Sequence, residues 1–505
     1  MNFGNALRAV VAVFRTRPDE LLPVYFLSPA IVQMTRVVSF LGVGLAYAYL
    51  ATTGRLARFR TELRAADRKP PGPGASIEAH RQWFDQAAPA FEVLFPAEVL
   101  AALAATALAS VTVFVVLYAA ATAAQLSCCR GTLDDEFGTE AAIAGAGRHW
   151  RTMLGLVLLQ VLAFVVVTAL AAAPVVVVAV ASPAAAVLVG LVVGLVWLAA
   201  LAALRVLFVF AAVAAVIDDE GVRDALGGAT GFVRANVGAT LAYVAVAVGV
   251  LGVVNAVSAL LGPGNGPVAA LLGVVLVSPL LDLLKTALYG DHAGGVSPPS
   301  PPAATVTEQL RAGIRRGLRT TRGFVAARPG LNALAAALVV AGFAAGWTLA
   351  APYEGLATAS VDARLQDHSP PTAAATFATN NLSVAVGSAL SGLALGVPAG
   401  VSLLFNGALL GVLGRLEAVP AELLAFVVPH GVVEIPALVV AGALGLSLGA
   451  TGWRAARGRI GRRALADSLE EAFWVLVGVA ALLAVAGLVE GFVSPYYYYR
   501  PFLAT

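Results

Sequence analysis

The sequence predicts an all-α protein: a polytopic integral membrane helical bundle of about eleven spans, with interfacial amphipathic helices. Apolar residues make up 59% of the 505 residues and charged residues 12%, whereas an average soluble domain has roughly 25% charged residues. The mean hydropathy is +0.86. Many apolar runs reach the roughly 20 residues that a helix needs to cross a bilayer, and a β-barrel would instead show alternating segments of about 10. The net charge of +3 is too small to indicate a nucleic-acid partner, so the lipid bilayer is the first partner we expect.

The first half, residues 1–292, is predicted to be a six-span membrane domain built from repeated units. The stretches DDEFGTEAAIAGAGRHWRTMLG from Asp134 and DDEGVRDALGGATGFVRANVG from Asp218 share paired aspartates, an Ala/Gly-rich helix and an arginine. Each is followed by two apolar runs, and NALRAVVAVFRTRPDELLP is a weaker copy near the start. This pattern predicts repeated units of an amphipathic helix plus a hairpin. The six spans are expected near residues 21–52, 99–126, 154–181, 184–217, 239–261 and 268–288.

A proline-rich segment separates this half from the next. Residues 293–302 lie in the stretch HAGGVSPPSPP, which cannot hold a helix and is typical of an extended linker. The remainder, residues 303–505, is predicted to be a second membrane domain of five spans. These spans are expected near residues 331–351, 382–397, 400–413, 423–448 and 473–493.

The arginines predict the orientation of the second half. Residues 311–328 and the stretch WRAARGRIGRR are rich in arginine, so both should be cytoplasmic. Five spans then place the C-terminus outside, with the tyrosines of PYYYYRPF at the outer interface. The loop at residues 53–98 also contains arginines, but its acidic residues offset them, and the repeat pattern predicts that it lies outside.

Polar residues occur inside several spans of the second half. A charged side chain near the middle of a membrane helix costs roughly 2.5–3.5 kcal/mol, so such residues should face protein or water. His430 and Glu434, four residues apart, share a helix face that continues in small residues to Gly445. Pro429 and Pro436 should break or kink this helix. The predicted buried polar cluster comprises Asn380, Asn381, Asn406, His430, Glu434 and Glu490, and the predicted helix-packing glycines are Gly392, Gly396, Gly400 and Gly445.

Three stretches of the second half occur in a specific order: NNLSVAVGSALSGLALGVPAGVSLLFNGALLGVLG, then PHGVVEIPALVVAGALGLSLG, then GLVEGF. With these elements the chain resembles the stage II sporulation protein M (SpoIIM) family over roughly residues 315–496. The resemblance implies a five-span domain in a prokaryotic cell membrane. In spore-forming bacteria the family's namesake belongs to a complex with peptidoglycan-degrading partners during engulfment. The short sporulation form lacks the first half and nothing in the sequence indicates spores, so that role is not transferred.

The sequence leaves three functions open. The first is a noncatalytic scaffold or assembly component of a cell-envelope complex, in which buried polar residues form interhelical hydrogen bonds worth about 0.6–2 kcal/mol each. The second is a transporter or permease subunit for an ion, lipid or small solute, with Glu434 or Glu490 on its path. The chain has no Gly-rich Lys-Ser/Thr nucleotide motif, so an ATP-driven version would need a separate ATPase.

The third function is an intramembrane enzyme using His430 and Glu434. His-x-x-x-Glu offers two metal ligands, and catalytic zinc normally needs three. We therefore favour the scaffold, assign no catalytic residue, cofactor or metal, and expect other membrane or envelope proteins as partners.

Two pairs of residues in the first half are close in sequence, and we expect both to have structural roles. Cys128 and Cys129 are adjacent, which disfavours an ordinary disulfide, so we expect two small buried residues. Asp282 and Lys285 are three residues apart near the end of a predicted helix. We expect them to form an ion pair.

The predicted orientation can be tested by cysteine labelling from each side of the membrane. In a variant without Cys128 and Cys129, a Thr505→Cys substitution should be labelled from the outside, because the two arginine-rich segments hold the preceding loops in the cytoplasm. Labelling from the inside alone would overturn the topology.

Overall fold

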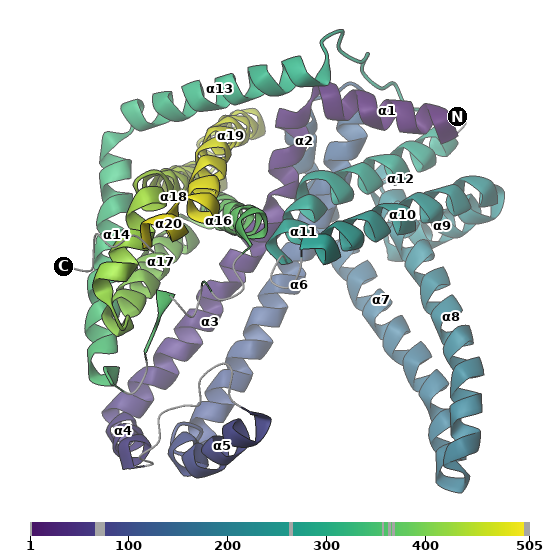
Figure 1. The fold of residues 1–505 in the computed structure, drawn as a ribbon. Helices are drawn as coiled ribbons and strands as arrows, with labels where there is room; N and C mark the ends of the chain where they lie inside the picture. The colour runs from purple at the N-terminus through teal and green to yellow at the C-terminus, as the bar shows by residue number, and fades with distance from the viewer. Residues whose placement is uncertain are drawn as a thin grey trace. The chain divides into compact units, whose positions relative to one another are not determined.

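The computed structural model describes residues 3–65, 76–261, 266–355, 358–361, 365 and 369–498 (Figure 1). The described residues are almost all helical, with an isolated bridge between Ala359 and Glu417 and no strand. Within these ranges ten helical segments are long and apolar enough to cross a membrane, which confirms the all-α, polytopic prediction. They are Pro18–Thr52, Ala97–Leu133, Gly138–Ala181, Pro183–Ile217, Val237–Leu261, Gly266–Ala293, Pro329–Tyr353, Val397–Leu416, Pro420–Ala456 and Arg462–Tyr496.

The eleventh predicted span, at residues 382–397, is wrong in its boundaries. The structure places a helix, α16, at Pro370–Ser391, and the chain turns before α17 begins at Val397. Leu395 and Gly396 both have left-handed backbone, with φ of 61° and 75°, which ends the helical run. Asn380 and Asn381 lie within α16 and reduce its apolar character. The side chains of residues 497–505, including most of the predicted tyrosine belt, lie outside the description.

The chain forms two compact units, each assembled from several segments. Unit 1 comprises Met1–Ser28, Val115–Gly313 and Ala455–Trp474. Unit 2 comprises Pro29–Phe114, Ile314–Arg454 and Val475–Thr505. The prediction that residues 293–302 separate two independently folding halves stays a prediction.

Unit 1 is built around buried aromatic and small side chains. Phe210 of α8 packs against Phe232 of α9 with ring centroids 4.7 Å apart, and Phe232 lies 5.3 Å from Tyr289 of α12. α1 buries Ala6 and Val10 on one face, as an amphipathic helix should. The unit contains α1 (Phe3–Thr16), α2 (Pro18–Tyr25), the later part of α6 (Ala97–Leu133), α7 (Gly138–Ala181), α8 (Pro183–Ile217), α9 (Val222–Ala235), α10 (Val237–Leu261), α11 (Gly266–Leu272), a π-helical turn (Gly273–Val277) and α12 (Ser278–Ala293).

The two aspartate-containing stretches each contain a residue with left-handed backbone. Asp135 follows α6 with φ of 62°, and Asp219 follows α8 with φ of 59°. Aspartate tolerates left-handed backbone because its short side chain can bond locally. The two turns precede α7 and α9, whose first residues carry the similar sequences. This shared geometry supports the predicted repeat, which stays a prediction.

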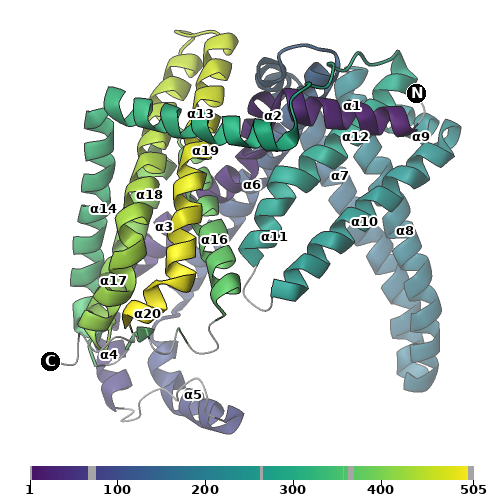
Figure 2. The same cartoon turned by 45° about the horizontal axis from the view of Figure 1, so that its top comes forward.

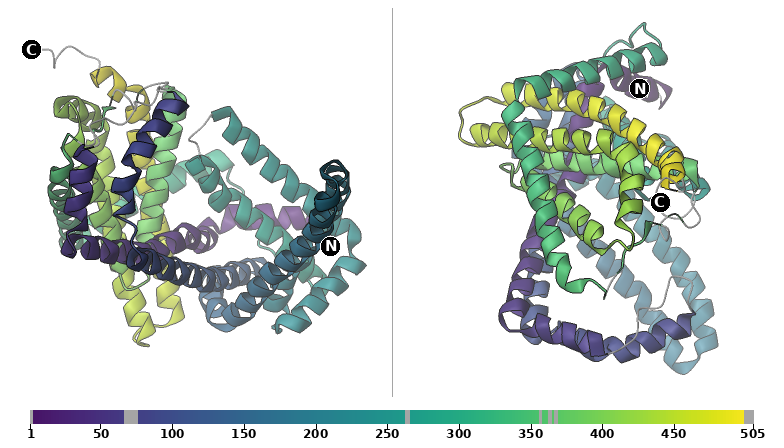
Figure 3. Two further views of the ribbon diagram at one scale, coloured as in Figure 1. Left: turned by 90° about the horizontal axis from the view of Figure 1, so that it is seen from below. Right: turned by 60° about the vertical axis from the view of Figure 1, so that its left-hand side comes forward.

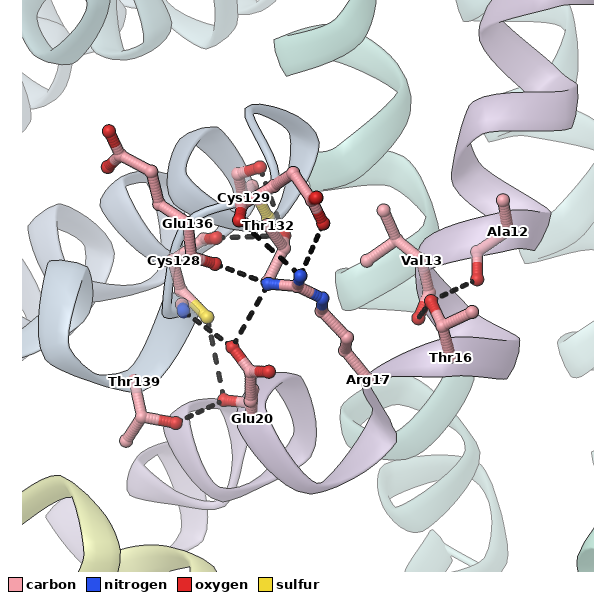
Figure 4. A network of polar contacts seen from close by, with 12 residues as sticks. Ala12, Val13, Thr16, Arg17, Glu20, Cys128, Cys129, Thr132, Glu136 and Thr139 are labelled. Atoms are coloured by element: carbon pink, nitrogen blue, oxygen red, sulfur yellow. Dashed lines mark hydrogen bonds and ion pairs between the residues drawn. The ribbon is translucent and has the colours of Figure 1, made fainter. Parts of the chain in front are cut away.

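A polar network ties the start of α7 to α2 in unit 1 (Figure 4). The Glu20 carboxylate accepts a 2.6 Å hydrogen bond from the backbone N–H of Gly138, at the N-terminus of α7. Thr139 donates to the Glu20 carbonyl at 3.0 Å. Arg17 donates to the Glu136 carbonyl at 2.5 Å and pairs with Asp135. A carboxylate at a helix N-terminus accepts from a free N–H and interacts favourably with the positive end of the helix dipole, so this network stabilises the start of α7.

Both predictions for neighbouring pairs are confirmed in unit 1. Lys285 Nζ lies 2.8 Å from Asp282 Oδ1, and both side chains are largely buried. Tyr25 donates to the other Asp282 oxygen at 2.9 Å, and its hydroxyl lies 3.2 Å from Cys129 Sγ. Cys128 and Cys129 are free thiols and completely buried. A buried ion pair with added hydrogen bonds is the form in which charges are tolerated inside a membrane bundle.

Unit 2 contains the helices that match the second-half spans. α18 and α19 run side by side (Figures 2 and 3). The unit holds all or most of α3 (Leu27–Thr52), α4 (Arg55–Ala65), α5 (Ile77–Glu92), α13 (Val306–Ala327), α14 (Pro329–Ala350), a 3₁₀ turn (Ala351–Tyr353), α16 (Pro370–Ser391), α17 (Val397–Leu416), α18 (Pro420–Ala456), α19 (Arg462–Phe492) and α20 (Ser494–Tyr498).

Glycines bring α14 and α17 into backbone contact. A Cβ at Gly342 or Gly346 of α14 would overlap backbone atoms of α17, and a Cβ at Gly407 or Gly411 of α17 would overlap backbone atoms of α14. Both pairs follow the four-residue spacing that places small residues on one helix face. Because each helix supplies glycines to the other's backbone, the interface is reciprocal.

We expect Gly346→Ala to destabilise the protein by roughly 1–3 kcal/mol, because the added methyl group would overlap the backbone of Ala408. Gly400→Ala is the matched control, since a Cβ there meets nothing within 4 Å. Unfolding curves of the detergent-solubilised protein would measure both. Equal stability of Gly346→Ala and wild type would contradict the close approach.

Candidate functional site

Two neighbouring helices and a short third one bring polar side chains together in unit 2. His430 and Glu434 lie one turn apart on α18, and Glu490 lies near the end of α19. Ser494 is the first residue of α20. α18 continues as a helix through Pro429 and Pro436, so these prolines do not break it, and the alternative of a kink stays a prediction. The continuous helix keeps His430 and Glu434 on one face, directed at α19.

The four side chains form a compact cluster. His430 Nδ1 lies 2.9 Å from Ser494 Oγ, and His430 Nε2 lies 3.9 Å from Glu490 Oε1. One ligand atom from each of His430, Glu434 and Glu490 lies within 4.8 Å of the other two. His430 and Glu490 are buried, with 5% and 8% of their surfaces exposed, Ser494 is fully buried and Glu434 is half-buried. This is the only such three-residue group among the described His, Cys, Asp and Glu residues.

Two carboxylate oxygens in the cluster have no partner. Glu434 Oε2 and Glu490 Oε2 are both buried and form no hydrogen bond. The 3.9 Å between His430 and Glu490 is longer than a hydrogen bond. Two carboxylates this close repel one another in a low-dielectric environment unless a proton or a cation lies among them. The cluster is therefore suited to holding a positive charge.

The structure also describes the predicted asparagines. Asn406 donates to the Ser402 carbonyl at 2.7 Å within α17 and lines a cavity of about 40 Å³ with Ile435 among its neighbours. Asn380 is exposed and donates to Asn381 at 3.5 Å. The exposed amide of Asn380 does not fit a buried cluster, whereas the place of Asn381 and Asn406 in the cluster stays a prediction.

Three of the four predicted packing glycines lie at close helix contacts. A Cβ at Gly392 would overlap the backbone of Gly445, and a Cβ at Gly445 would lie 2.5 Å from the Ser388 carbonyl oxygen. Gly396 approaches Gly449, which the sequence analysis did not single out. Gly400 has open space where its side chain would be, so it has no part in this contact.

Ser494 and the glycines of α14 and α17 were not among the residues predicted from the sequence. Ser494 follows Glu490 by four residues, a helical spacing that places both near one face, but it lies in a new short helix. Two GxxxG patterns, Gly342–Gly346 and Gly407–Gly411, could have predicted this helix packing from the sequence.

An apolar groove of about 660 Å³ lies beside the cluster. It runs between α18 and α19, and its walls include Pro429 and Val489, the immediate sequence neighbours of His430 and Glu490. The remaining lining residues are Ala421, Leu424, Ala425, Val428, Val432 and Val493. The cluster is thus screened on this side by hydrocarbon side chains.

Comparison with known proteins agrees with the resemblance seen in the sequence. The family described as "Stage II sporulation protein M" (SpoIIM) matches residues 335–495, the C-terminal part of the chain, which contains His430, Glu434, Glu490 and Ser494. No curated protein and no solved structure matches the chain.

Proposed function

We propose that this SpoIIM-like membrane protein is a noncatalytic scaffold or assembly component of a cell-envelope complex. The observation that favours this function is the backbone contact between α14 and α17, to which both helices contribute glycines. Alternating access requires one group of helices to rock or slide against another. Helices whose backbones touch through glycines lose that contact when they slide, so the interface favours a rigid platform.

The arginines of α13 provide a surface for partners. In unit 2 this helix buries Gly317, Thr321 and Phe324 and exposes the opposite face. Arg315, Arg316, Arg319 and Arg322 lie on that exposed face. Such a row of guanidinium groups fits acidic protein surfaces or anionic lipid headgroups at the cytoplasmic side.

The scaffold is tested by isolating the tagged full-length protein from its native membranes in mild detergent. We expect a stoichiometric complex with at least one other membrane or envelope protein, measured by native mass spectrometry. Gly346→Ala should weaken that complex because it loosens the platform, whereas Gly400→Ala should retain it. A chain that is recovered alone under these conditions would contradict the scaffold.

Two other functions are a proton- or ion-coupled permease subunit and an intramembrane enzyme. Both are favoured by the cluster of His430, Glu434 and Glu490. Ionisable residues inside membrane bundles often mark ion pathways. The scaffold and these two functions make opposite demands on Glu434. A scaffold needs a hydrogen-bonding group of the right size, whereas proton transfer or catalysis needs a carboxylate.

We expect Glu434→Gln to complement a deletion strain and, measured after chelator treatment, to keep thermal stability near the wild-type value, because the amide preserves the size and polarity of the side chain. Glu434→Leu should destabilise the bundle, since it replaces the polar group that lies near His430 and Glu490 by a hydrocarbon side chain. Loss of complementation by Glu434→Gln with unchanged thermal unfolding would instead establish chemistry at the cluster.

A further inference from the structure

We propose that His430, Glu434 and Glu490 bind a divalent transition-metal ion of the zinc type. The sequence indicated no metal site because His430 and Glu434 supply two ligands. Glu490, from α19, supplies a third, and the three candidate ligand atoms lie within 4.8 Å of one another. This inference goes beyond the proposed scaffold, because it concerns a bound ion and requires no partner protein.

The ligand set selects the class of metal. Imidazole nitrogen and carboxylate oxygen are both zinc ligands, at about 2.0–2.2 Å from the ion. Calcium and magnesium prefer sites made of oxygen atoms alone. Three protein ligands leave one position of a tetrahedral ion open, which is the arrangement of zinc sites that bind water or a substrate. Small side-chain rotations would bring the three ligand atoms to their shared distance from one ion.

Ser494 fixes the ring of His430 in the orientation that a metal needs. Its Oγ lies 2.9 Å from His430 Nδ1, and it is fully buried, so the contact is not replaced by water. In the tautomer that carries its proton on Nδ1, the imidazole donates to Ser494 and its Nε2 lone pair faces Glu490. A lone pair directed at a carboxylate is repulsive, and an ion between the two removes the repulsion. Metal-binding histidines commonly use their second nitrogen in this way.

The unpartnered oxygens are an independent indication of a ligand. Glu490 is more than nine-tenths buried, yet its Oε2 has no hydrogen-bond partner, and the same holds for Oε2 of Glu434. Buried polar atoms are normally satisfied by protein, water or an ion. Glu62 and Glu470 also keep one buried oxygen without a hydrogen bond, but among the described residues only Glu434 and Glu490 form a three-residue group with a histidine.

The test is zinc binding by the full-length protein in detergent. After chelator treatment and desalting, we expect wild type to take up about one equivalent of Zn²⁺, by elemental analysis, and to unfold at a higher temperature with Zn²⁺ than without it. Glu490→Gln and His430→Asn should lose both effects. Ser494→Ala should bind about 10–100-fold more weakly, because it removes the partner of the imidazole rather than a ligand.

Glu471→Gln is the matched control, since Glu471 is an exposed carboxylate on the same helix. It should bind Zn²⁺ like wild type. Co²⁺ substitution adds a readout that does not depend on stability, because a nitrogen and oxygen site of low coordination number gives visible absorption that Glu490→Gln should lose. Absence of Zn²⁺ uptake by folded wild type, or equal uptake by wild type and Glu490→Gln, would overturn the proposal and leave the scaffold untouched.

Discussion

Close approach of helix backbones is the constraint on which the second unit depends. Between α14 and α17, and between the α16–α17 turn and α18, glycines occupy positions where a single Cβ would overlap the facing backbone. In a bilayer, lipid tails are as apolar as leucine, so burial of side chains does little to hold helices together. Van der Waals contact between closely packed backbones therefore supplies much of the attraction.

That packing determines where polar residues can be placed. Backbone contact holds Gly392 of the turn against Gly445 of α18, and α18 in turn presents His430 and Glu434 to α19. Every polar group at such depth must find its partner inside the protein. Asn406 finds it in the Ser402 carbonyl of its own helix, and His430 finds it in Ser494. Glu434 and Glu490 each keep one buried oxygen without a hydrogen bond, and among the described residues they alone form a three-residue group with a histidine.

The sequence predicted properties of single helices better than contacts between helices. The ten spans, the Asp282–Lys285 pair and the shared face of His430 and Glu434 follow from run length or a 3.6-residue period. The predicted boundaries of α16 were wrong because the left-handed turn at Leu395 and Gly396 depends on tertiary contacts, which hydropathy does not reveal. Contact between Glu490 and His430 also depends on which helices pair. A single sequence does not encode that pairing in any simple spacing.

A rigid bundle and a bound ion are physically compatible, and each makes the other easier to understand. A metal ion demands ligands held within narrow distances, which flexible helices provide poorly and glycine-packed helices provide well. An ion bound by α18 and α19 would in turn link Glu490, close to the C-terminal end of α19, to His430 and Glu434 in the first half of α18. The groove along the same two helices is lined by apolar side chains, and in apolar surroundings a cation and carboxylates attract one another more strongly than in water. A platform of this kind can therefore hold a positively charged ion where the bilayer alone would exclude it.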